Sequence, residues 1–311
     1  MRKPDPVAGK LSDPAGTQET MSSSFRFGVN MFLTDSKKSW IEKCRKAEDS
    51  GFDVLGVADH LGFLAPLPAM LLAAEATERA QVNSFVLNVP FYNPTLLARE
   101  VATLDLLTDG RVELGLGAGY VKSEFDAAAI EFPSAGRRVQ QVADAARTLR
   151  ATFADPDYRP RPARAGGPPL LIAGWGERML RVAAEHADVV AFTGGGTTDS
   201  GLITAGTPED LDQRVAAVRQ ALGPRRESTE FNILIQQLAA PNERAALLER
   251  LAPNLPEGAA DRAEEIPMLL VGTPAQMADQ LRERHKRYGI SYFTVLEPNM
   301  DKMARVIELL R

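Results

Sequence analysis

Short apolar segments recur along the chain at nearly constant intervals, and a helical pattern follows most of them. The first four begin at residues 26, 54, 84 and 112, at intervals of 28, 30 and 28 residues. Several are almost continuous apolar runs, as in parallel strands that are covered by helices on their outer side. The sequence predicts eight such strands, at residues 26–31, 54–59, 84–90, 112–117, 170–173, 189–193, 231–236 and 291–296.

A strand–helix unit of this size repeated eight times predicts an α/β fold, a (β/α)8 TIM barrel. A doubly wound open sheet is the alternative that the same alternation permits. The longer gaps at residues 120–169 and 237–273 are interpreted as insertions after strands four and seven. In such a barrel the active site lies at the C-terminal ends of the strands, so functional residues are sought there.

Helix start and stop signals lie between the strands. The helices are expected to begin at a capping Ser or Thr, or at a proline, and to end at glycine. They are residues 37–50 before Gly51, a helix from Pro94 to Asp109-Gly110, residues 137–151, a helix from the N-cap Thr207 to Gly223, and one from the N-cap Thr273 to Gly289.

Composition narrows the class of protein. The 311 residues carry 36 Lys+Arg against 41 Asp+Glu, a net charge of −5, without a basic cluster that would indicate nucleic-acid binding. No apolar run is long enough to span a membrane. The single cysteine, Cys44, and three separated histidines offer no metal-binding spacing. We therefore expect a cytoplasmic protein without a metal, with a single domain at residues 25–311 after a flexible polar tail at residues 1–24.

His60 is the first candidate for chemistry. The second predicted strand ends in Ala58-Asp59-His60, which places a titratable imidazole beside a carboxylate at the end of a strand. His186 precedes a strand and His285 lies within a predicted helix, so neither is at the active end. The alternative, a histidine whose hydrogen bonds are satisfied within a loop, stays open.

Glycine-rich segments follow three further strands. Gly115-Leu-Gly-Ala-Gly119-Tyr120 resembles a dinucleotide fingerprint, but its third glycine comes one residue too early. Ala173-Gly174-Trp175-Gly176 leads directly into a helix at residues 177–186, whose N-terminus could hold an anion or phosphate. Residues 193–196, Thr-Gly-Gly-Gly, could leave room for a ring. For the first segment a tight turn is the plain alternative. For the second, an ordinary strand–helix loop with a packed Trp is the alternative, and the residues alone favour neither.

Aromatic side chains and absent motifs complete the survey. Phe91 and Tyr92 follow the third strand and could line a pocket, although core packing is the commoner fate of such residues. The sequence contains no nucleophile elbow, no phosphate-binding loop and no Cys–His signature.

Five blocks in order identify the sequence as similar to a known family. They are Val57-Ala-Asp-His60, Val86-Leu-x-x-Pro90-x-x-Asn-Pro94, the run from Leu104 to Gly119, the run from Ile172 to Ala184, and Val271-Gly-Thr-Pro274. These blocks resemble the bacterial luciferase-like monooxygenase superfamily over residues 25–311. Within it the sequence looks closest to the coenzyme F420-dependent oxidoreductases, whose FMN-using relatives share the same blocks.

The resemblance implies a flavin or deazaflavin ring at the mouth of the barrel. It implies a non-proline cis peptide between Phe85 and Val86 against the ring's face, and Asp59 and His60 beside its hydride-carrying edge. The cofactor-contacting segments of the family correspond to Ala118, Gly119, Tyr120 and Ser123, and to Ala173, Gly174, Trp175, Gly176, Glu177 and Arg178. Some sugar-oxidising members carry a Glu where Tyr120 stands here, which argues against a sugar substrate.

These implications lead to a functional hypothesis. The chain is expected to be an F420-dependent oxidoreductase that moves hydride between C5 of the deazaflavin and an organic small molecule. His60 would act in acid–base chemistry, Asp59 would orient it, and Trp175, Phe91, Tyr92 and Phe63 would wall the pocket. The alternative is an FMN-dependent monooxygenase that uses O2 and reduced flavin from a separate reductase. A non-catalytic binding protein on the same barrel is a third reading. The family also implies a homodimer, with no nucleic-acid or membrane partner.

Overall fold

The computed structural model describes residues 25–197 and 203–311 and shows a closed parallel barrel. The predicted flexible tail at residues 1–24 lies outside the described residues. The nine strands of the main sheet occupy eight positions around the barrel, which we call staves. β3 and β4 together form the third stave. They are β1 (Arg26–Met31), β2 (Val54–Val57), β3 (Gln81–Ser84), β4 (Leu87–Asn88), β5 (Val112–Gly117), β6 (Leu170–Gly174), β7 (Val189–Phe192), β10 (Glu230–Ile235) and β13 (Tyr292–Leu296). The predicted TIM barrel is confirmed, and the open-sheet alternative is wrong.

The third stave differs from its prediction. It begins at Gln81 rather than Ser84, and it divides after Ser84 into β3 and β4. β3 pairs with both β2 and β5, which closes the barrel, whereas β4 pairs with β5. The upper half of this stave therefore has a backbone ladder on one side.

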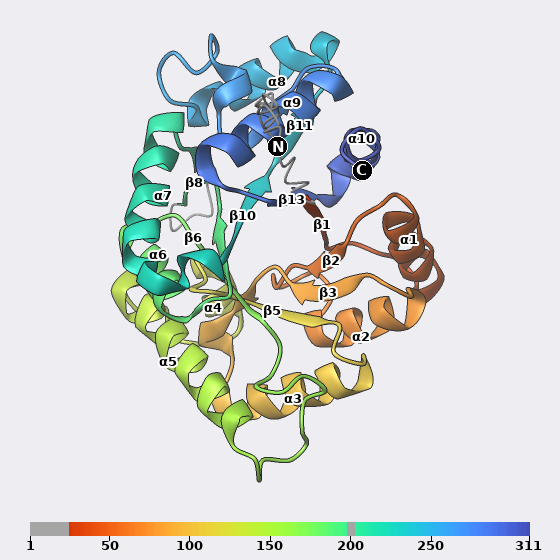
Figure 1. Cartoon of the computed structure of the whole chain (residues 1–311), viewed down its shortest axis with the longest axis vertical. Coiled ribbons are helices and arrows are strands. Elements are labelled where there is room, and N and C mark those ends of the chain that lie inside the picture. Colours follow the sequence, from red (N-terminus) through yellow and green to blue (C-terminus); the bar gives the residue numbers. More distant parts are fainter. Residues whose placement is uncertain (1–24, 198–202) are drawn as a thin grey trace, which may run out of the picture.

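Helices surround the barrel, as Figure 1 shows. The predicted N-caps Thr207 and Thr273 both form capping boxes, and Gly289 adopts the predicted left-handed conformation, with φ of 69°. The outer helices are α1 (Lys37–Asp49), α2 (Pro66–Ala76), α3 (Pro94–Leu107), α5 (Ala135–Ala154), α6 (Glu177–His186), α7 (Pro208–Leu222), α9 (Pro274–Tyr288) and α10 (Met300–Ile307).

Apolar side chains fill two layers. A large cluster lies between the sheet and the helices and includes Trp40, Leu97 and Leu149. A smaller cluster fills the inside of the barrel and includes Phe85, Leu171 and Tyr292, with the partly buried Val86 packed against it. Burial of these two layers supplies the main stabilising free energy of the fold.

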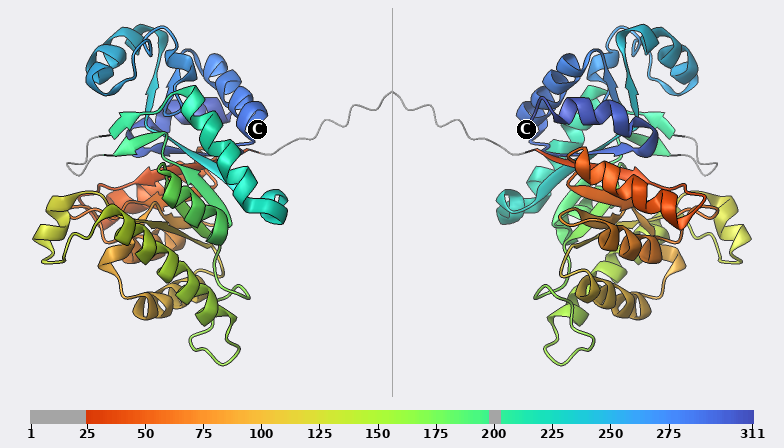
Figure 2. Two further views of the ribbon diagram at one scale, coloured as in Figure 1. Left: turned by 90° about the vertical axis from the view of Figure 1, so that its left-hand side faces the viewer. Right: turned by 90° about the vertical axis from the view of Figure 1, so that its right-hand side faces the viewer.

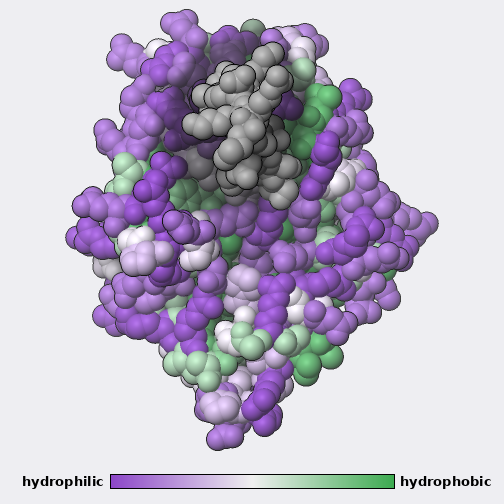
Figure 3. Space-filling view, viewed as in Figure 1, coloured by the Kyte–Doolittle hydropathy of each residue, from purple (hydrophilic) through white to green (hydrophobic). Residues whose placement is uncertain are grey.

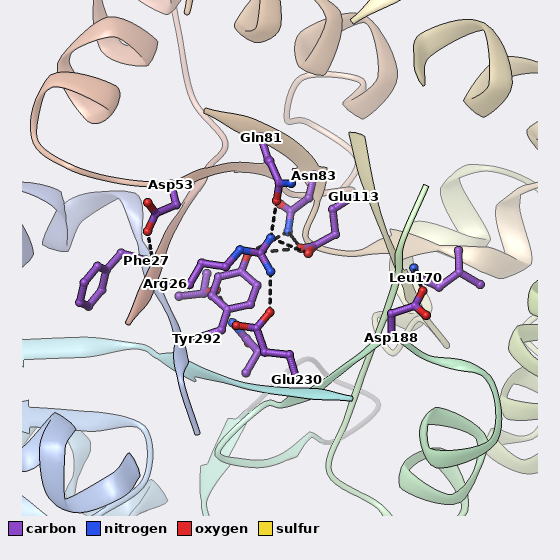
Figure 4. Close-up of polar contacts among 12 residues, drawn as sticks. Arg26, Phe27, Asp53, Gln81, Asn83, Glu113, Leu170, Asp188, Glu230 and Tyr292 are labelled. Atoms are coloured by element: carbon purple, nitrogen blue, oxygen red, sulfur yellow. Dashed lines mark hydrogen bonds and ion pairs between the residues drawn. The ribbon is translucent and has the colours of Figure 1, made fainter. Parts of the chain in front are cut away.

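The amino-terminal end of the barrel is filled by charge instead. The guanidinium of Arg26 contacts Glu113 Oε2 at 2.7 Å, Glu230 Oε2 at 2.6 Å and Gln81 Oε1 at 2.5 Å (Figure 4). Its carbon Cζ also lies 4.3 Å from the centre of the Tyr292 ring. This network closes the barrel at the end opposite to the carboxyl ends of the strands.

Three insertions interrupt the regular alternation, where the sequence predicts two. The predicted insertion after strand four contains α4 (Lys122–Ala127) and the barrel helix α5. The one after strand seven contains β11 (Gln237–Ala239), α8 (Arg244–Leu251) and β12 (Leu269–Val271). The sequence does not predict the hairpin of β8 (Gly195–Thr197) and β9 (Ile203–Ala205) after β7. Figure 2 shows α4 and this hairpin projecting from the same side of the barrel.

Two features of the molecule concern its possible binding to membranes and to other proteins. No helix in the described part of the chain is long and apolar enough to cross a membrane. Hydrophilic residues dominate the face shown in Figure 3, and hydrophobic ones form small separate patches on the part of that face that is not grey.

Candidate active site

His60 lies in the loop after β2, at the carboxyl ends of the strands, and its hydrogen-bond partner is Glu124. The His60 Nδ1 atom lies 2.8 Å from Glu124 Oε1, and the two side chains are 30% and 15% exposed. Glu124 comes from α4, where the predicted cofactor residue Ser123 is exposed. The structure thus gives His60 a carboxylate partner that the sequence analysis does not name.

Asp59 does not take the role expected for it. We expect it to orient His60, but its Oδ2 accepts hydrogen bonds from the Asn88 N–H at 2.8 Å and the Tyr92 hydroxyl at 3.0 Å. Burial raises the pKa of Asp59, against these two hydrogen bonds, which lower it. Burial and the nearby Asp59 carboxylate raise the pKa of Tyr92. Asp59 therefore fastens the loop after β2 to the segment after β4.

Four rings, that of His60 among them, stand in a row. Phe32 stacks on Phe63 with centroids 5.1 Å apart, Phe63 meets the His60 ring edge-on at 5.7 Å, and His60 meets Tyr120 edge-on at 5.8 Å. Burial and the charge of Glu124 both raise the pKa of Tyr120, and burial has the larger effect. The predicted pocket residue Phe63 and the predicted cofactor residue Tyr120 therefore flank the imidazole on two sides.

The peptide bond between Phe85 and Val86 is cis, which confirms the prediction from the family resemblance. Asn30 at the end of β1 donates to the Phe85 carbonyl at 3.0 Å. A Cβ on Gly115 would lie 1.9 Å from the Ser84 carbonyl oxygen, and one on Gly117 would lie 2.5 Å from Val86. These two glycines make room for the Ser84–Val86 segment, so their role here is close packing against the protein's own backbone.

Phe91 packs toward α4. Its ring meets Phe125 at 4.8 Å, and Phe125 meets Phe132 at 4.9 Å. The guanidinium of Arg138 lies 4.0 Å from the Phe132 ring centre and donates to the Gly119 carbonyl at 3.1 Å. This cluster holds α4, and with it Glu124, against the end of β5. Phe91 supports the site through this cluster.

The N-terminus of α6 is open to a ligand. Its N-cap Gly176 provides no side-chain hydrogen bond, and a Cβ there would meet no atom within 4 Å. Glu177 pairs with Arg181 one turn further on. Arg178, also exposed, makes no hydrogen bond or ion pair to the described residues. The first turn therefore offers free N–H groups and a cation, which suits a phosphate.

Trp175 lies against α7. Its ring stands 4.3 Å from the Arg214 guanidinium, which also donates to the Trp175 carbonyl at 2.9 Å. A Cβ on Gly206 would come within 2.1 Å of the indole, and one on Gly174 within 2.4 Å of Met179. Arg214 therefore fixes the loop between β6 and α6, which follows the buried strand residue Ala173.

Two surface hollows do not include His60, although the first reaches Glu177 at the start of α6. One of about 610 Å³ separates α6 from α7, and one of about 660 Å³ surrounds Arg26 at the amino ends of the strands. The candidate active site is placed at the carboxyl ends because the His60–Glu124 pair and the open helix terminus occur there.

Comparisons with known proteins follow the same lines. The family model described as luciferase-like monooxygenase matches residues 18–202, more than half of the chain. An F420-dependent glucose-6-phosphate dehydrogenase from Amycolatopsis mediterranei is 34% identical over 35% of this chain and 36% of its own length. A 5,10-methylenetetrahydromethanopterin reductase from Archaeoglobus fulgidus is 27% identical over 65% of this chain and 66% of its own length. The matches thus span about a third to two thirds of these relatives.

Solved structures match over nearly the whole fold. An F420-dependent tetrahydromethanopterin reductase from Methanopyrus kandleri superimposes with a TM-score of 0.69 at 17% identity, covering 91% of this chain and 97% of its own. An F420-dependent secondary alcohol dehydrogenase with an F420-acetone adduct gives a TM-score of 0.70 at 19% identity, covering 93% and 99%. At these identities the likeness shows the fold.

Proposed function

Since this chain belongs to the luciferase-like monooxygenase family, we propose that it is a coenzyme F420-dependent oxidoreductase acting on an organic small molecule. The predicted family is confirmed by the match. Two curated relatives support the choice of F420. The glucose-6-phosphate dehydrogenase is named as F420-dependent. The other is a methylenetetrahydromethanopterin reductase, and the solved structure of a tetrahydromethanopterin reductase is described as F420-dependent.

The observation that carries this proposal is the His60–Glu124 pair, 2.8 Å apart at the carboxyl ends of the strands. A hydride transfer to or from a carbon bearing oxygen also moves a proton, and an imidazole held by a carboxylate can give or take it. We assign this proton transfer to the Nε2 atom of His60. Glu124 accepts from Nδ1–H and so fixes the tautomer with a free Nε2.

The residues around the pair fit a ring with a phosphate tail. The buried Asn88 Oδ1 has no hydrogen-bond partner among the described residues, and it would accept from a bound group. Val86 is partly exposed between Gly115 and Gly117 and would support one face of a planar ring. The N–H groups at Gly176–Arg178 and the Arg178 guanidinium would hold the phosphate.

When bound, the deazaflavin would supply a two-electron hydride acceptor or donor at its C5 atom. The chain's own residues do the remainder: Val86 and Asn88 orient the ring, His60 moves the proton, and Asp59 keeps the Asn88 segment in place. In this assignment Asp59 is a positioning residue, and Trp175 acts by holding the phosphate-binding loop.

An FMN-dependent monooxygenase is the second candidate, favoured by the description of the matching family. It would take reduced flavin from a separate reductase and consume O2. The same residues would hold the ring and the phosphate, so the cofactor itself must be tested. A homodimer remains our proposal for the assembly.

Titration with each cofactor tests the proposal. The chain has two tryptophans, and Trp40 is buried while Trp175 lies at the proposed site. We expect saturable quenching of tryptophan fluorescence by F420, weaker quenching by FMN, and loss of the signal in Trp175→Phe. Anaerobic turnover with reduced F420 should fall by at least 10²-fold in His60→Ala. Tight FMN binding with O2 uptake would instead select the monooxygenase, and binding of neither cofactor would refute both.

A further inference from the structure

The rim of the barrel mouth beside His60 is apolar. Leu33 is 53% exposed in the loop after β1, and Leu61 and Phe63 are 49% and 38% exposed in the loop after β2. Phe32, partly buried, stacks on Phe63. We call these four side chains the apolar rim. Two neighbouring strand ends thus present large hydrophobic groups to solvent at the position where a substrate would enter.

The rim is continuous with the catalytic imidazole. Phe32, Phe63 and His60 form successive ring contacts, with centroids 5.1 and 5.7 Å apart. Aromatic rings pair with one another in offset-stacked or edge-on geometry, so the exposed part of the Phe63 ring suits contact with a further flat apolar group. A molecule lying on Phe63 would have its neighbouring atoms at the edge of His60.

Backbone hydrogen bonds hold the rim in place. The Phe63 N–H donates to the His60 carbonyl at 3.1 Å, in a turn that Gly62 completes with φ of +96°. The Phe32 N–H donates to Glu297 Oε2 at 3.0 Å. The rim is therefore formed before a ligand arrives, which lowers the entropy cost of binding.

Three ion pairs lie in the segments next to the rim. Glu124 is held by His60, Glu297 contacts Lys43, and Lys122 pairs with Asp126. A charged ligand that bound to one of these six side chains would have to break its pair. An uncharged ligand needs no such exchange.

We propose that the substrate is an uncharged alcohol, or the corresponding carbonyl compound, that carries an apolar ring. This proposal rests on the proposed function. The ring lies on the apolar rim and the oxygen lies at His60 Nε2. In the oxidative direction the carbinol C–H bond breaks and its hydride passes to the deazaflavin, the hydroxyl proton passes to His60, and a C=O bond forms. Reduction of the carbonyl compound is the reverse.

Binding of 2-naphthalenemethanol, a fluorescent uncharged alcohol, tests the ligand class without any cofactor. We expect its anisotropy to rise with the wild-type protein, and the dissociation constant to increase about tenfold in Phe63→Ser. Leu61→Ser should weaken binding, and Phe63→Leu should restore most of it. The matched control is Leu106→Ser, since Leu106 on α3 is also 49% exposed but lies away from the mouth. Equal binding to all variants would overturn the proposal.

A second set of measurements separates the ligand class from the cofactor. Turnover of F420 with 2-naphthalenemethanol or 2-naphthaldehyde in preference to glucose 6-phosphate would support the proposal, whereas preference for the sugar phosphate would overturn it and leave the oxidoreductase standing. Binding that depends on the rim, without F420 turnover of any compound, would support the ligand class and refute the proposed function. Sedimentation at several protein concentrations tests whether the rim is instead a subunit interface. If Phe63→Ser dissociates a dimer and leaves probe binding unchanged, the rim is a subunit interface and the proposal is wrong.

Discussion

At the scale of single residues, the site depends on a pairing that crosses the barrel mouth. His60 and Glu124 are 64 positions apart, and their 2.8 Å contact exists because α4 folds back over the end of β5. Aromatic packing of Phe91, Phe125 and Phe132 sets that position. The pair thus joins a loop residue to a helix that the regular barrel does not require.

Glu124→Gln is expected to lower kcat by about 10²-fold with a smaller effect on KM, because the amide cannot hold the imidazole as the carboxylate does. Only three histidines are present, so the ring nitrogens of His60 can be assigned by NMR. In the wild-type protein the Nδ1 atom should be the protonated nitrogen, and Glu124→Gln should change this preference.

Asp126→Asn is the matched control for that variant. Asp126 lies on the same helix, is 59% exposed at its side chain and pairs with Lys122, so kcat should stay within about twofold. A loss of activity in both variants would show that α4 matters through its fold alone. An unchanged His60 spectrum in Glu124→Gln would contradict the assigned tautomer.

Sequence reasoning could identify His60 but not its partner. The position of His60 after a strand marks it, and the family blocks repeat that signal. Asp59 was the natural candidate for orienting it because the two are adjacent, yet adjacent residues in an extended loop point in different directions. Glu124 had no comparable signal, since its contact arises from tertiary folding alone.

At the scale of elements, the glycines of β5 determine how the third stave passes its neighbour. Gly115 exchanges hydrogen bonds with Ser84 Oγ through its N–H and its carbonyl, at 3.0 and 2.9 Å. The backbone approach at this point leaves no room for a side chain. Gly115 and Gly117 thus serve packing within the barrel, and the residues expected to contact the cofactor, Ala118, Gly119 and Tyr120, lie beyond the strand.

Gly115→Ala should destabilise the protein by about 3 kcal/mol, because its Cβ would lie 1.9 Å from a backbone oxygen that cannot move freely. Gly176→Ala is the comparison, since its Cβ has no neighbour within 4 Å and its φ of −68° suits alanine. Its stability should change by less than about 0.5 kcal/mol. Urea unfolding of both variants measures the difference, and similar midpoints would contradict the packing argument.

Glu48 connects α1 to the start of β3 and gives a pH-dependent prediction. Burial alone would raise the pKa of Glu48, but hydrogen bonds from the backbone N–H groups of Arg79, Ala80 and Glu78 lower it below 4.5. Its carboxylate therefore stabilises the fold above the unfolded-state pKa, and this contribution is lost as the pH falls through the folded-state pKa. At pH 7, Glu48→Gln should cost about 1.5 kcal/mol.

The gap between wild type and Glu48→Gln should narrow as the pH is lowered from 7 towards 3. Urea unfolding at several pH values measures it. Glu42→Gln on the same helix, where Glu42 is 64% exposed, should give a small gap at every pH. A gap for Glu48→Gln that stays constant with pH would mean that the carboxylate's charge is not the source of the stability.

Most strand and helix boundaries followed from sequence, and the exceptions have physical causes. The third stave was predicted too late because it opens with Gln81 and Asn83, polar residues that point into the charged end of the barrel. A strand that fills part of its interior with a hydrogen-bond network does not look apolar. The β8–β9 hairpin was missed because each of its strands is only three residues long and β8 contains two glycines.

At the scale of the whole molecule, the barrel separates stability from chemistry. Glu113 at its amino-terminal end is 1% exposed and depends on Arg26 for its countercharge, while the His60–Glu124 pair lies at the opposite end. Burial raises the pKa of Glu230, the other carboxylate of this network, against the effect of Arg26. Residues at the two ends should therefore be separable by mutation.

Arg26→Ala should destabilise the fold by about 3 kcal/mol, because it leaves Glu113 buried without a cation. Its kcat/KM below the unfolding transition should stay unchanged. Arg311→Ala provides the control at the same end, since Arg311 and its partner Asp53 are 42% and 34% exposed, and should cost less than about 1 kcal/mol. Equal costs, measured by urea unfolding, would show that the interior network contributes no more than a surface pair.

The fold and the family could be predicted from the sequence because the fold depends on regular spacing of strands and the family on motif blocks in a fixed order. The arrangement of the insertions was not, since their contacts join segments that have no fixed spacing. Arg284 on α9 shows this: it is buried, its pKa falls to about 10 through burial, and it donates to the Ile266 carbonyl at 3.0 Å. One arginine thus fastens the insertion between β10 and α9 to the barrel.

The divided third stave has a consequence for hydrogen exchange. Beyond Phe85 the third stave no longer pairs with β2. At Asn88 a side-chain carboxylate, that of Asp59, accepts the backbone N–H at 2.8 Å. Protection of that one amide against deuterium therefore depends on the charge and position of a titratable group, whereas its neighbours in β5 are protected by the main-chain ladder. The Asn88 amide is a natural reporter: its exchange rate follows the state of the barrel mouth in the wild-type protein, with no label or substitution.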